Sequence, residues 1–149
     1  AISACEKGRQ WGWAMLLLAE MRATHVRPDV GTYSAAVSAC EKGQQWQRAL
    51  SILSSMQKRR IAPNTVTYNA AISACEKGQQ PEHAFQLFHK MREDALVPDV
   101  ISYGAIVSAC EKRHEWEMAL HFFGDMRRSS TEPNVVTYSA VISACEKAC

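Results

Sequence analysis

The 149-residue sequence lacks a hydrophobic run long enough to cross a membrane. Its richest apolar stretch, Trp13–Ala19, is followed by Glu20 and is shorter than the roughly 20 residues that a spanning helix needs. The chain also lacks a marked excess of charge, because 17 Lys and Arg are nearly balanced by 15 Asp and Glu, for a net charge of +2. We therefore expect a soluble chain with no membrane partner, and the net charge by itself favours no class of ligand.

Patterns typical of enzymes and metal sites are missing as well. The five histidines share no spacing and have no recognisable catalytic partner; they are His25, His83, His89, His114 and His121. Cys145 and Cys149 are four residues apart, but no nearby His or second Cys pair would complete a metal site. The sequence therefore predicts no catalysis, no metal, no cofactor and no small-molecule substrate.

The six cysteines do not predict disulfide bonds. Five of them recur at one spacing, namely Cys5, Cys40, Cys75, Cys110 and Cys145. Neighbouring packed helices lie about 8–10 Å apart, which exceeds the roughly 7 Å between Cα atoms that a disulfide allows. We expect these thiols to be reduced and to act as small buried apolar residues.

The sequence is instead dominated by self-similarity with a period of 35 residues. The pentamer Ser-Ala-Cys-Glu-Lys occurs five times, beginning at Ser3, Ser38, Ser73, Ser108 and Ser143. The same step relates three further sets: Met21, Met56, Met91 and Met126; Pro28, Pro63, Pro98 and Pro133; Tyr33, Tyr68, Tyr103 and Tyr138. Because several sets of residues recur with the same 35-residue period, the sequence indicates a repeat array in which each unit packs on its neighbours.

The period divides the chain into three complete and two partial units. We expect a partial unit over residues 1–29, complete units over 30–64, 65–99 and 100–134, and a partial unit over 135–149 that contains a first helix only. The chain opens without Met, and Ala1–Lys7 repeats sequence found further along. This predicts that the chain is a piece of a longer protein.

Each unit reads as a hairpin of two helices. Proline disfavours a helix before it, and a short acceptor side chain after it caps the next turn; the expected N-caps are Asp29, Asn64, Asp99 and Asn134. A first helix is then predicted from about Val30 to Lys42, with Tyr33, Ala36, Val37 and Cys40 on its buried face. Gly43 and Gly78 fit its C-terminal stop.

A second helix is expected to begin near Trp46, since its counterpart Pro81 suits the first position of a helix. The buried stripe is predicted to be Trp46, Ala49, Leu50, Leu53 and Met56; then Ala84, Phe85, Phe88 and Met91; then Trp116, Ala119, Leu120, Phe123 and Met126. One hairpin cannot bury both faces by itself. The predicted fold is therefore all-α, a solenoid of stacked antiparallel helical hairpins whose inner surface is lined by the first helices.

Polar residues form a regular stripe on the first helix. Ser34, Ser38 and Lys42 are four residues apart and share one face. Stacking turns the last of these into a ladder of lysines: Lys42, Lys77, Lys112 and Lys147. The ladder fits a track for a phosphate backbone, but it also fits an ordinary solvated face, because a glutamate such as Glu41 precedes every lysine. The residues alone leave these two interpretations open.

The unit from Thr65 to Asp99 carries Val66-Thr67-Tyr68-Asn69 at its start, Ala84 and Phe88 in its second helix, and Pro98-Asp99 at its end. With these residues, the chain resembles the pentatricopeptide repeat family over its whole length, whereas tetratricopeptide units have 34 residues and a different pattern. The resemblance implies a right-handed superhelix that binds single-stranded RNA, with one base facing each unit.

The resemblance also implies which residues read the bases: the residue after each Tyr and the residue after each Pro. The complete pairs are Ser34 with Asn64, Asn69 with Asp99, and Gly104 with Asn134, while Ser139 and Asp29 lack partners in this chain. A carboxylate only accepts hydrogen bonds and an amide also donates. By similarity to the family, we expect adenine at Ser34/Asn64, uracil at Asn69/Asp99 and weak discrimination at Gly104/Asn134.

Further roles follow from the same resemblance. Aliphatic residues that sandwich each base correspond to Val66, Ile101 and Val136, and Gly31 departs from that pattern. The lysines of the ladder correspond to phosphate contacts, and the family implies a mitochondrion or plastid. Two alternatives stay open: a protein-binding scaffold within a ribonucleoprotein or RNA-processing complex, and the RNA-binding part of an enzyme whose catalytic domain lies beyond Cys149.

Overall fold

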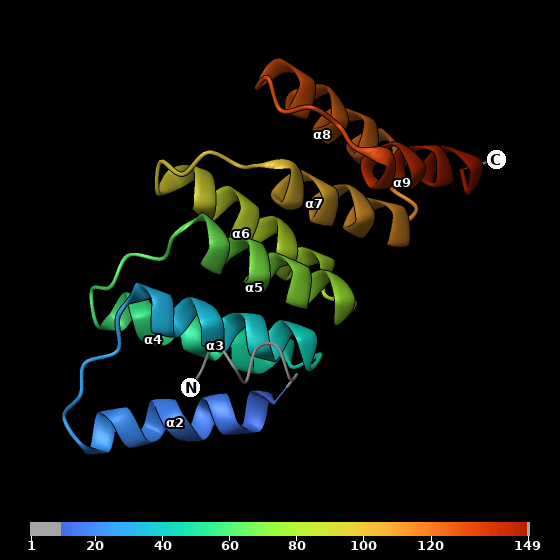
Figure 1. Ribbon diagram of the computed structural model, residues 1–149. Helices are drawn as coiled ribbons and strands as arrows, with labels where there is room; N and C mark the ends of the chain where they lie inside the picture. The colour runs from blue at the N-terminus through green and yellow to red at the C-terminus, as the bar shows by residue number, and fades with distance from the viewer. Residues whose placement is uncertain (1–9, 149) are drawn as a thin grey trace.

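The computed structural model describes residues 10–148, and every regular element among them is an α-helix (Figure 1). First and second helices alternate along the chain. The helices are α2 (Trp11–Ala23), α3 (Val30–Lys42), α4 (Trp46–Lys58), α5 (Thr65–Lys77), α6 (Pro81–Glu93), α7 (Val100–Lys112), α8 (Trp116–Arg128) and α9 (Val135–Glu146). The predictions of a first helix from Val30 to Lys42 and of a second helix from Trp46 are confirmed.

The start of each first helix is set by a short polar side chain. The side chains of Asp29, Asn64 and Asn134 each accept a hydrogen bond from the backbone N–H three residues on, and Asp99 accepts from two backbone N–H groups. Such a cap contributes about 1 kcal/mol to helix stability, since it satisfies a donor that has no partner inside the helix. All four predicted N-caps are confirmed.

The hairpins stack into a solenoid in which the first helices form a continuous layer. Helices α3, α5, α7 and α9 pack each on the next, whereas the backbones of α4, α6 and α8 approach only first helices. The stack runs from α2 at the blue end to α9 at the red end of Figure 1. This all-α repeat fold is the predicted one, and Tyr33, Ala36, Val37 and Cys40 are completely buried in its core.

The buried stripe of the second helices differs from the prediction. Ile52, Leu87 and Phe122 are buried although they were not expected to be, whereas Trp116 and Leu120 are 40% and 42% exposed. Helices α4, α6 and α8 each pack between their own first helix and the next one, and the buried face of each therefore includes one of these three residues. Phe85 stacks on Phe122 of α8 with 6.0 Å between ring centroids; α8 is the last second helix of the described chain, so Leu120 has no such neighbour.

Gly43 and Gly78 are the C-caps of α3 and α5, which confirms that the first helices stop there, but neither glycine has a left-handed conformation. The left-handed residues are the next ones, Gln44 (φ 57°) and Gln79 (φ 56°). Glycine is needed for close approach instead, because a Cβ would lie 2.2 Å from Trp11 Cδ1 at position 43 and 2.4 Å from Trp46 Cδ1 at position 78. A tryptophan of one hairpin thus packs on a glycine of the next.

At the third junction between hairpins, an ion pair between Arg113 and Glu82 replaces this contact. Pro81 stands where Trp11 and Trp46 stand in the earlier units, and Arg113 stands where the glycines stand. The Arg113 guanidinium lies 2.5 Å from Glu82 and 2.9 Å from Glu115. Where the large ring is absent, a long charged side chain therefore occupies the position that would otherwise need glycine.

The Trp46–Gly78 contact predicts opposite effects for two glycine-to-alanine substitutions. Gly78→Ala should lower the free energy of unfolding by about 1–3 kcal/mol, because its Cβ would overlap the Trp46 ring. Gly124→Ala, inside α8, should raise it by about 0.5–1 kcal/mol, because its Cβ meets only the Arg128 guanidinium at 3.5 Å. Urea unfolding followed by circular dichroism measures both. Equal effects of the two variants would contradict the proposed packing role of Gly78.

Candidate nucleic-acid interface

The candidate site lies where the start of one first helix meets the fifth residue of the preceding first helix. The Asn69 amide nitrogen Nδ2 donates to Asp99 Oδ1 at 3.0 Å and to Oδ2 at 3.1 Å. In the hairpin before, the Ser34 hydroxyl lies 3.3 Å from Asn64 Oδ1. The residues of these two sequence-predicted pairs are 30 positions apart in the chain, and the stacking of α3, α5 and α7 brings them into contact.

A third polar residue, which the sequence analysis did not single out as a site residue, joins each pair. Thr67 Oγ1 lies 2.6 Å from Ser34 Oγ and donates to Asn64 Oδ1 at 2.8 Å. Ser102 Oγ donates to Asn69 Oδ1 at 2.5 Å and also lies 3.1 Å from Asp99 Oδ1. Thr67 and Ser102 are completely buried. The only signal in the sequence is that a hydroxyl residue precedes every tyrosine of the repeat.

The candidate reading residues differ in how far they are exposed. Ser34 and Asn69 are buried, at 7% and 6% exposure, while Asn64, Asp99 and Gly104 are half-buried. Asp29, Asn134 and Ser139 are exposed. A hydrogen bond from the Thr32 backbone N–H lowers the pKa of Asp29, so this carboxylate stays ionised at neutral pH. Each of the two complete polar pairs therefore combines a buried side chain with a half-buried one, whereas Asp29, Asn134 and Ser139 face solvent.

Aliphatic side chains stand beside the polar pairs. Val66, Ile101 and Val136, the second residues after the respective N-caps, are 57%, 58% and 65% exposed. Exposed valine or isoleucine at the same position of three successive first helices gives a row of apolar surface next to the pairs. Gly31 supplies no side chain at this position of α3.

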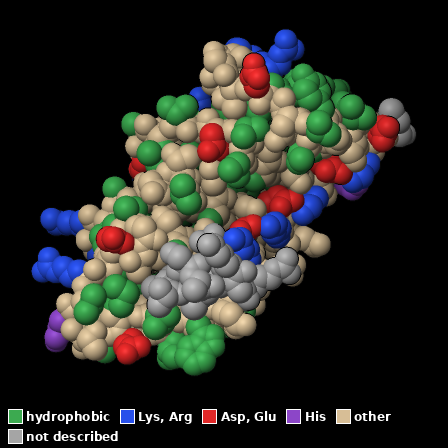
Figure 2. Space-filling model, viewed as in Figure 1, with side chains coloured by type: hydrophobic (Ala, Val, Ile, Leu, Met, Phe, Trp, Pro, Cys, Tyr) green, Lys and Arg blue, Asp and Glu red, His purple; other side chains and the backbone are tan. Residues whose placement is uncertain are grey.

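The lysine ladder is tied to glutamates of the preceding first helix. Lys77 pairs with Glu41, Lys112 with Glu76 at 2.6 Å, and Lys147 with Glu111 at 2.8 Å. A serine four residues before each lysine also donates to the same glutamate. The distances are 3.1 Å for Ser73, 2.8 Å for Ser108 and 2.7 Å for Ser143. Figure 2 shows the resulting alternation of acidic and basic side chains near the C-terminal ends of the first helices.

These ion pairs hold the lysines in place without burying them. The side chains of Lys77, Lys112 and Lys147 are each 44% exposed, against 14%, 11% and 21% for their glutamates. Hydrogen bonding from Lys147 lowers the pKa of Glu111. Lys42, the first of the series, is exposed at the end of α3. The ammonium groups therefore face solvent in a row, with part of their charge compensated.

A hollow of about 480 Å³ opens beside the ladder at the junction that lacks tryptophan. Its lining is formed by Glu76, Gln79, Pro81, Ala109, Lys112, Arg113, His114 and Lys147.

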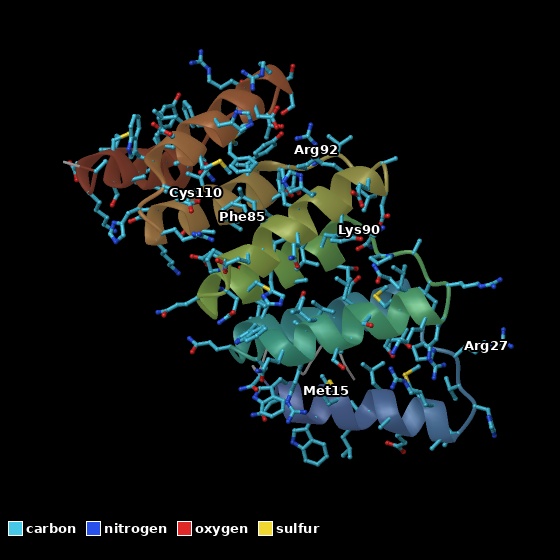
Figure 3. All side chains as sticks on the ribbon, turned by 180° about the vertical axis from the view of Figure 1, so that it is seen from behind. Met15, Arg27, Phe85, Lys90, Arg92 and Cys110 are labelled. Atoms are coloured by element: carbon cyan, nitrogen blue, oxygen red, sulfur yellow. The ribbon has the colours of Figure 1, made fainter. Side chains whose placement is uncertain are left out.

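A different edge of the molecule carries further cations. Arg27, Lys90 and Arg92 lie at or just beyond the C-terminal ends of the second helices (Figure 3). Arg92 is paired with Asp125 at 3.1 Å and Lys90 with Asp94 at 3.3 Å.

The cysteines act as packing residues. Cys40, Cys75 and Cys110 are completely buried free thiols, which confirms the predicted role, and burial raises their pKa values to about 11, 12 and 12. Cys5 and Cys149 lie outside the described residues. Between residues 10 and 148, no group of three His, Cys, Asp or Glu side chains is placed to hold a metal ion. Nor does any helix of that stretch have the length and apolarity to cross a bilayer.

Comparison with known families gives the class of protein. Residues 63–112 and 98–147 match the model of the PPR repeat family, and residues 16–78 match that of the pentatricopeptide repeat domain. The chain therefore belongs to the pentatricopeptide repeat family, as its motifs had indicated. No protein of curated function matches it in sequence.

Solved structures show the same fold. The PPR domain of Arabidopsis thaliana protein-only RNase P 1, solved in complex with tRNA, is 19% identical with a TM-score of 0.86, over 99% of this chain and 81% of that one. PPR10, solved in complex with an 18-nt psaJ RNA element, is 24% identical with a TM-score of 0.82, over 97% of this chain and 21% of that one. Arabidopsis thaliana nuclear proteinaceous RNase P 2 is 14% identical with a TM-score of 0.83, over 96% of this chain and 33% of that one.

The burial of the repeated cysteines predicts slow chemical modification. Because the thiolate is the reactive species and burial disfavours it, Cys40, Cys75 and Cys110 should react with iodoacetamide at neutral pH at least about tenfold more slowly in the folded protein than in urea. Peptide mass spectrometry after timed labelling measures each site. Half-buried Cys145 serves as the internal comparison. Rapid labelling of Cys75 in the folded chain would contradict this packing.

Proposed function

We propose that this chain binds single-stranded RNA without catalysing a reaction, with one base facing each complete hairpin. The observation that carries the proposal is the Asn69–Asp99 pair, in which a buried amide and a half-buried carboxylate from successive first helices meet. Membership of the pentatricopeptide repeat family and the likeness to structures solved with RNA support it. The proposed units are residues 30–64, 65–99 and 100–134, with partial units over 1–29 and 135–149.

The Asn69/Asp99 pair matches the Watson–Crick edge of uracil. Asp99 Oδ1 accepts from the backbone N–H groups of Ile101 and Ser102, whereas Oδ2 accepts only from Asn69 and keeps room for a ring N–H. If one N–H of Asn69 is shared between both oxygens of Asp99, the second N–H is left for a base carbonyl. One acceptor beside one donor is the complement of the N3–H and O4 of uracil.

The Ser34/Asn64 pair fits adenine. Asn64 Oδ1 is occupied by the backbone N–H and the hydroxyl of Thr67, so the Nδ2 group is the part of the amide left to donate to a ring nitrogen. The short Ser34 leaves space for a purine. Gly104 has no side chain to join Asn134, and we therefore propose weak discrimination there, while Asp29 and Ser139 are proposed readers whose partners lie outside this chain.

The neighbouring residues supply contacts that do not depend on sequence. Val66, Ile101 and Val136 are proposed to sandwich the bases, because their exposed apolar surfaces stand beside the pairs. Lys42, Lys77, Lys112 and Lys147 are proposed to contact phosphates. Since three of these lysines are paired with glutamates, each phosphate has to compete with a carboxylate, and this contribution to affinity is modest. The family further supports a mitochondrial or plastid RNA as the target.

Binding to short single-stranded RNAs tests the proposal. RNAs with adenine facing Ser34/Asn64 and uracil facing Asn69/Asp99 should bind more tightly than their permutations, by about 1–3 kcal/mol for each base, a scale taken from DNA readout. Raising salt should weaken binding with a log–log slope of about −2 to −3 for four lysine–phosphate contacts. Fluorescence anisotropy measures both quantities. Equal or absent binding of all RNAs would instead favour a protein-binding scaffold.

Exchanging one pair for the other gives a sharper test. Asn69→Ser combined with Asp99→Asn recreates the Ser34/Asn64 pair one hairpin later, and should shift the preferred base at that position from uracil to adenine. The N-cap bond to Ser102 is kept, because asparagine also accepts from a backbone N–H. Anisotropy with the base panel measures the preference, and thermal unfolding checks the fold. Unchanged base preference in a folded double variant would contradict the proposed assignment.

A further inference from the structure

We propose that Thr67 and Ser102, the third residues after their N-caps, determine base specificity by fixing which polar atoms of the reading pairs face the RNA. This inference rests on the proposed function. Neither residue is exposed to solvent, since both are completely buried. They are positioning residues, which act through the side chains of the two neighbouring pairs.

The environment of Thr67 shows how the first pair is held. The Thr67 backbone N–H donates to Asn64 Oδ1 at 2.9 Å, and the Thr67 hydroxyl donates to the same oxygen at 2.8 Å. A backbone N–H only donates, so the atom that it meets has to be the amide oxygen. A flipped Asn64 amide would set its NH₂ group against this backbone donor, and the Thr67 hydroxyl would lose its acceptor. The Asn64 Nδ2 group is therefore the part that faces outward.

The same hydroxyl group also contacts Ser34. Ser34 Oγ lies 2.6 Å from Thr67 Oγ1, 2.8 Å from the Val30 carbonyl oxygen and 3.3 Å from Asn64 Oδ1. Its single hydrogen has an acceptor inside the protein at every one of these contacts, so Ser34 offers the RNA lone pairs only. Together the pair presents a donor from Asn64 and an acceptor from Ser34. The ring nitrogen and amino group of adenine are the complement of this arrangement.

Ser102 plays the equivalent part in the second pair. Its hydroxyl accepts from the Asp99 backbone N–H at 3.1 Å and lies 2.5 Å from Asn69 Oδ1, the oxygen to which it donates. The Asn69 oxygen is thereby held inward, and Nδ2 is held on Asp99. This leaves Asp99 Oδ2 as the acceptor for a ring N–H. At the Gly104/Asn134 pair, the Thr137 hydroxyl of α9 donates to Asn134 Oδ1 at 2.9 Å, but Gly104 provides no second side chain for it to orient.

Thr67→Val tests the inference, because valine keeps the shape and the backbone N–H but removes the hydroxyl. Without that hydroxyl, the Ser34 hydrogen and the Asn64 amide lose a shared partner, and the preference for adenine at this position should fall at least about fivefold. The preference for uracil at Asn69/Asp99 should not change. Anisotropy with RNAs that differ at one base measures both ratios in the same variant.

Three further variants separate orientation from stability. Thr67→Ser retains the hydroxyl and should keep the adenine preference. Thr65→Val makes the same chemical change two residues away, where the described structure gives the side chain no hydrogen bond, and should leave both preferences unchanged. Ser102→Ala should reduce the preference for uracil instead. Because alanine is small and helix-favouring, Ser102→Ala supplies the test if Thr67→Val does not fold, as judged from thermal unfolding.

The outcomes distinguish this inference from the proposed function. If the parent chain shows no base preference at either pair, the proposed function is overturned, and this inference with it. If the parent discriminates, but Thr67→Val and Ser102→Ala discriminate equally well, the inference is overturned and the proposed function stands. Loss of preference at the altered pair alone, with Thr67→Ser unaffected, supports the inference.

Discussion

The hydrogen bond from a backbone N–H to the N-cap side chain is the constraint on which the rest of this molecule depends. It starts α3, α5, α7 and α9, and it also holds the Asn64 or Asp99 side chain against the fifth residue of the preceding first helix. Because one residue begins a helix and completes a pair, the candidate site has the same period as the fold. Capping is therefore compatible with the proposed base reading by the same side chain, because the capping bond leaves other polar atoms of that side chain available.

Much of the fold is predictable from the sequence, because the same N-cap and the same buried positions recur in every complete repeat. The Pro-Asp and Pro-Asn steps located the first helices, and Tyr33, Ala36, Val37 and Cys40 located their buried face. The second-helix stripe was less predictable: burial of Phe122 rather than Leu120 depends on packing between two first helices, which one helix viewed alone does not contain. The need for glycine at position 78 was also not predictable, because it depends on contact with Trp46 from the preceding hairpin.

The candidate site was predictable in its residues but not in its connections. The family motif gave Asn69 and Asp99, whereas the buried hydroxyl of Ser102 between them required three-dimensional contacts. The ion pairs of the lysine ladder were likewise not predictable from the order of residues alone. Glu76 precedes Lys77 in sequence, yet it pairs with Lys112 of the next first helix, because residues at the ends of stacked helices meet across the layer. The ladder therefore joins successive hairpins as well as offering positive charge to a ligand.

The junctions between hairpins use two kinds of contact with different physical behaviour. Trp11 on Gly43 and Trp46 on Gly78 bury apolar surface, whose contribution is little affected by salt. At the third junction Arg113 is held between Glu82 and Glu115, and salt screens such exposed pairs. In an array where each hairpin contacts only its neighbours, the weakest junction limits how far order propagates. Salt screening of Arg113 would therefore act at the junction between α5–α6 and α7–α8, which also carries the Asn69–Asp99 pair.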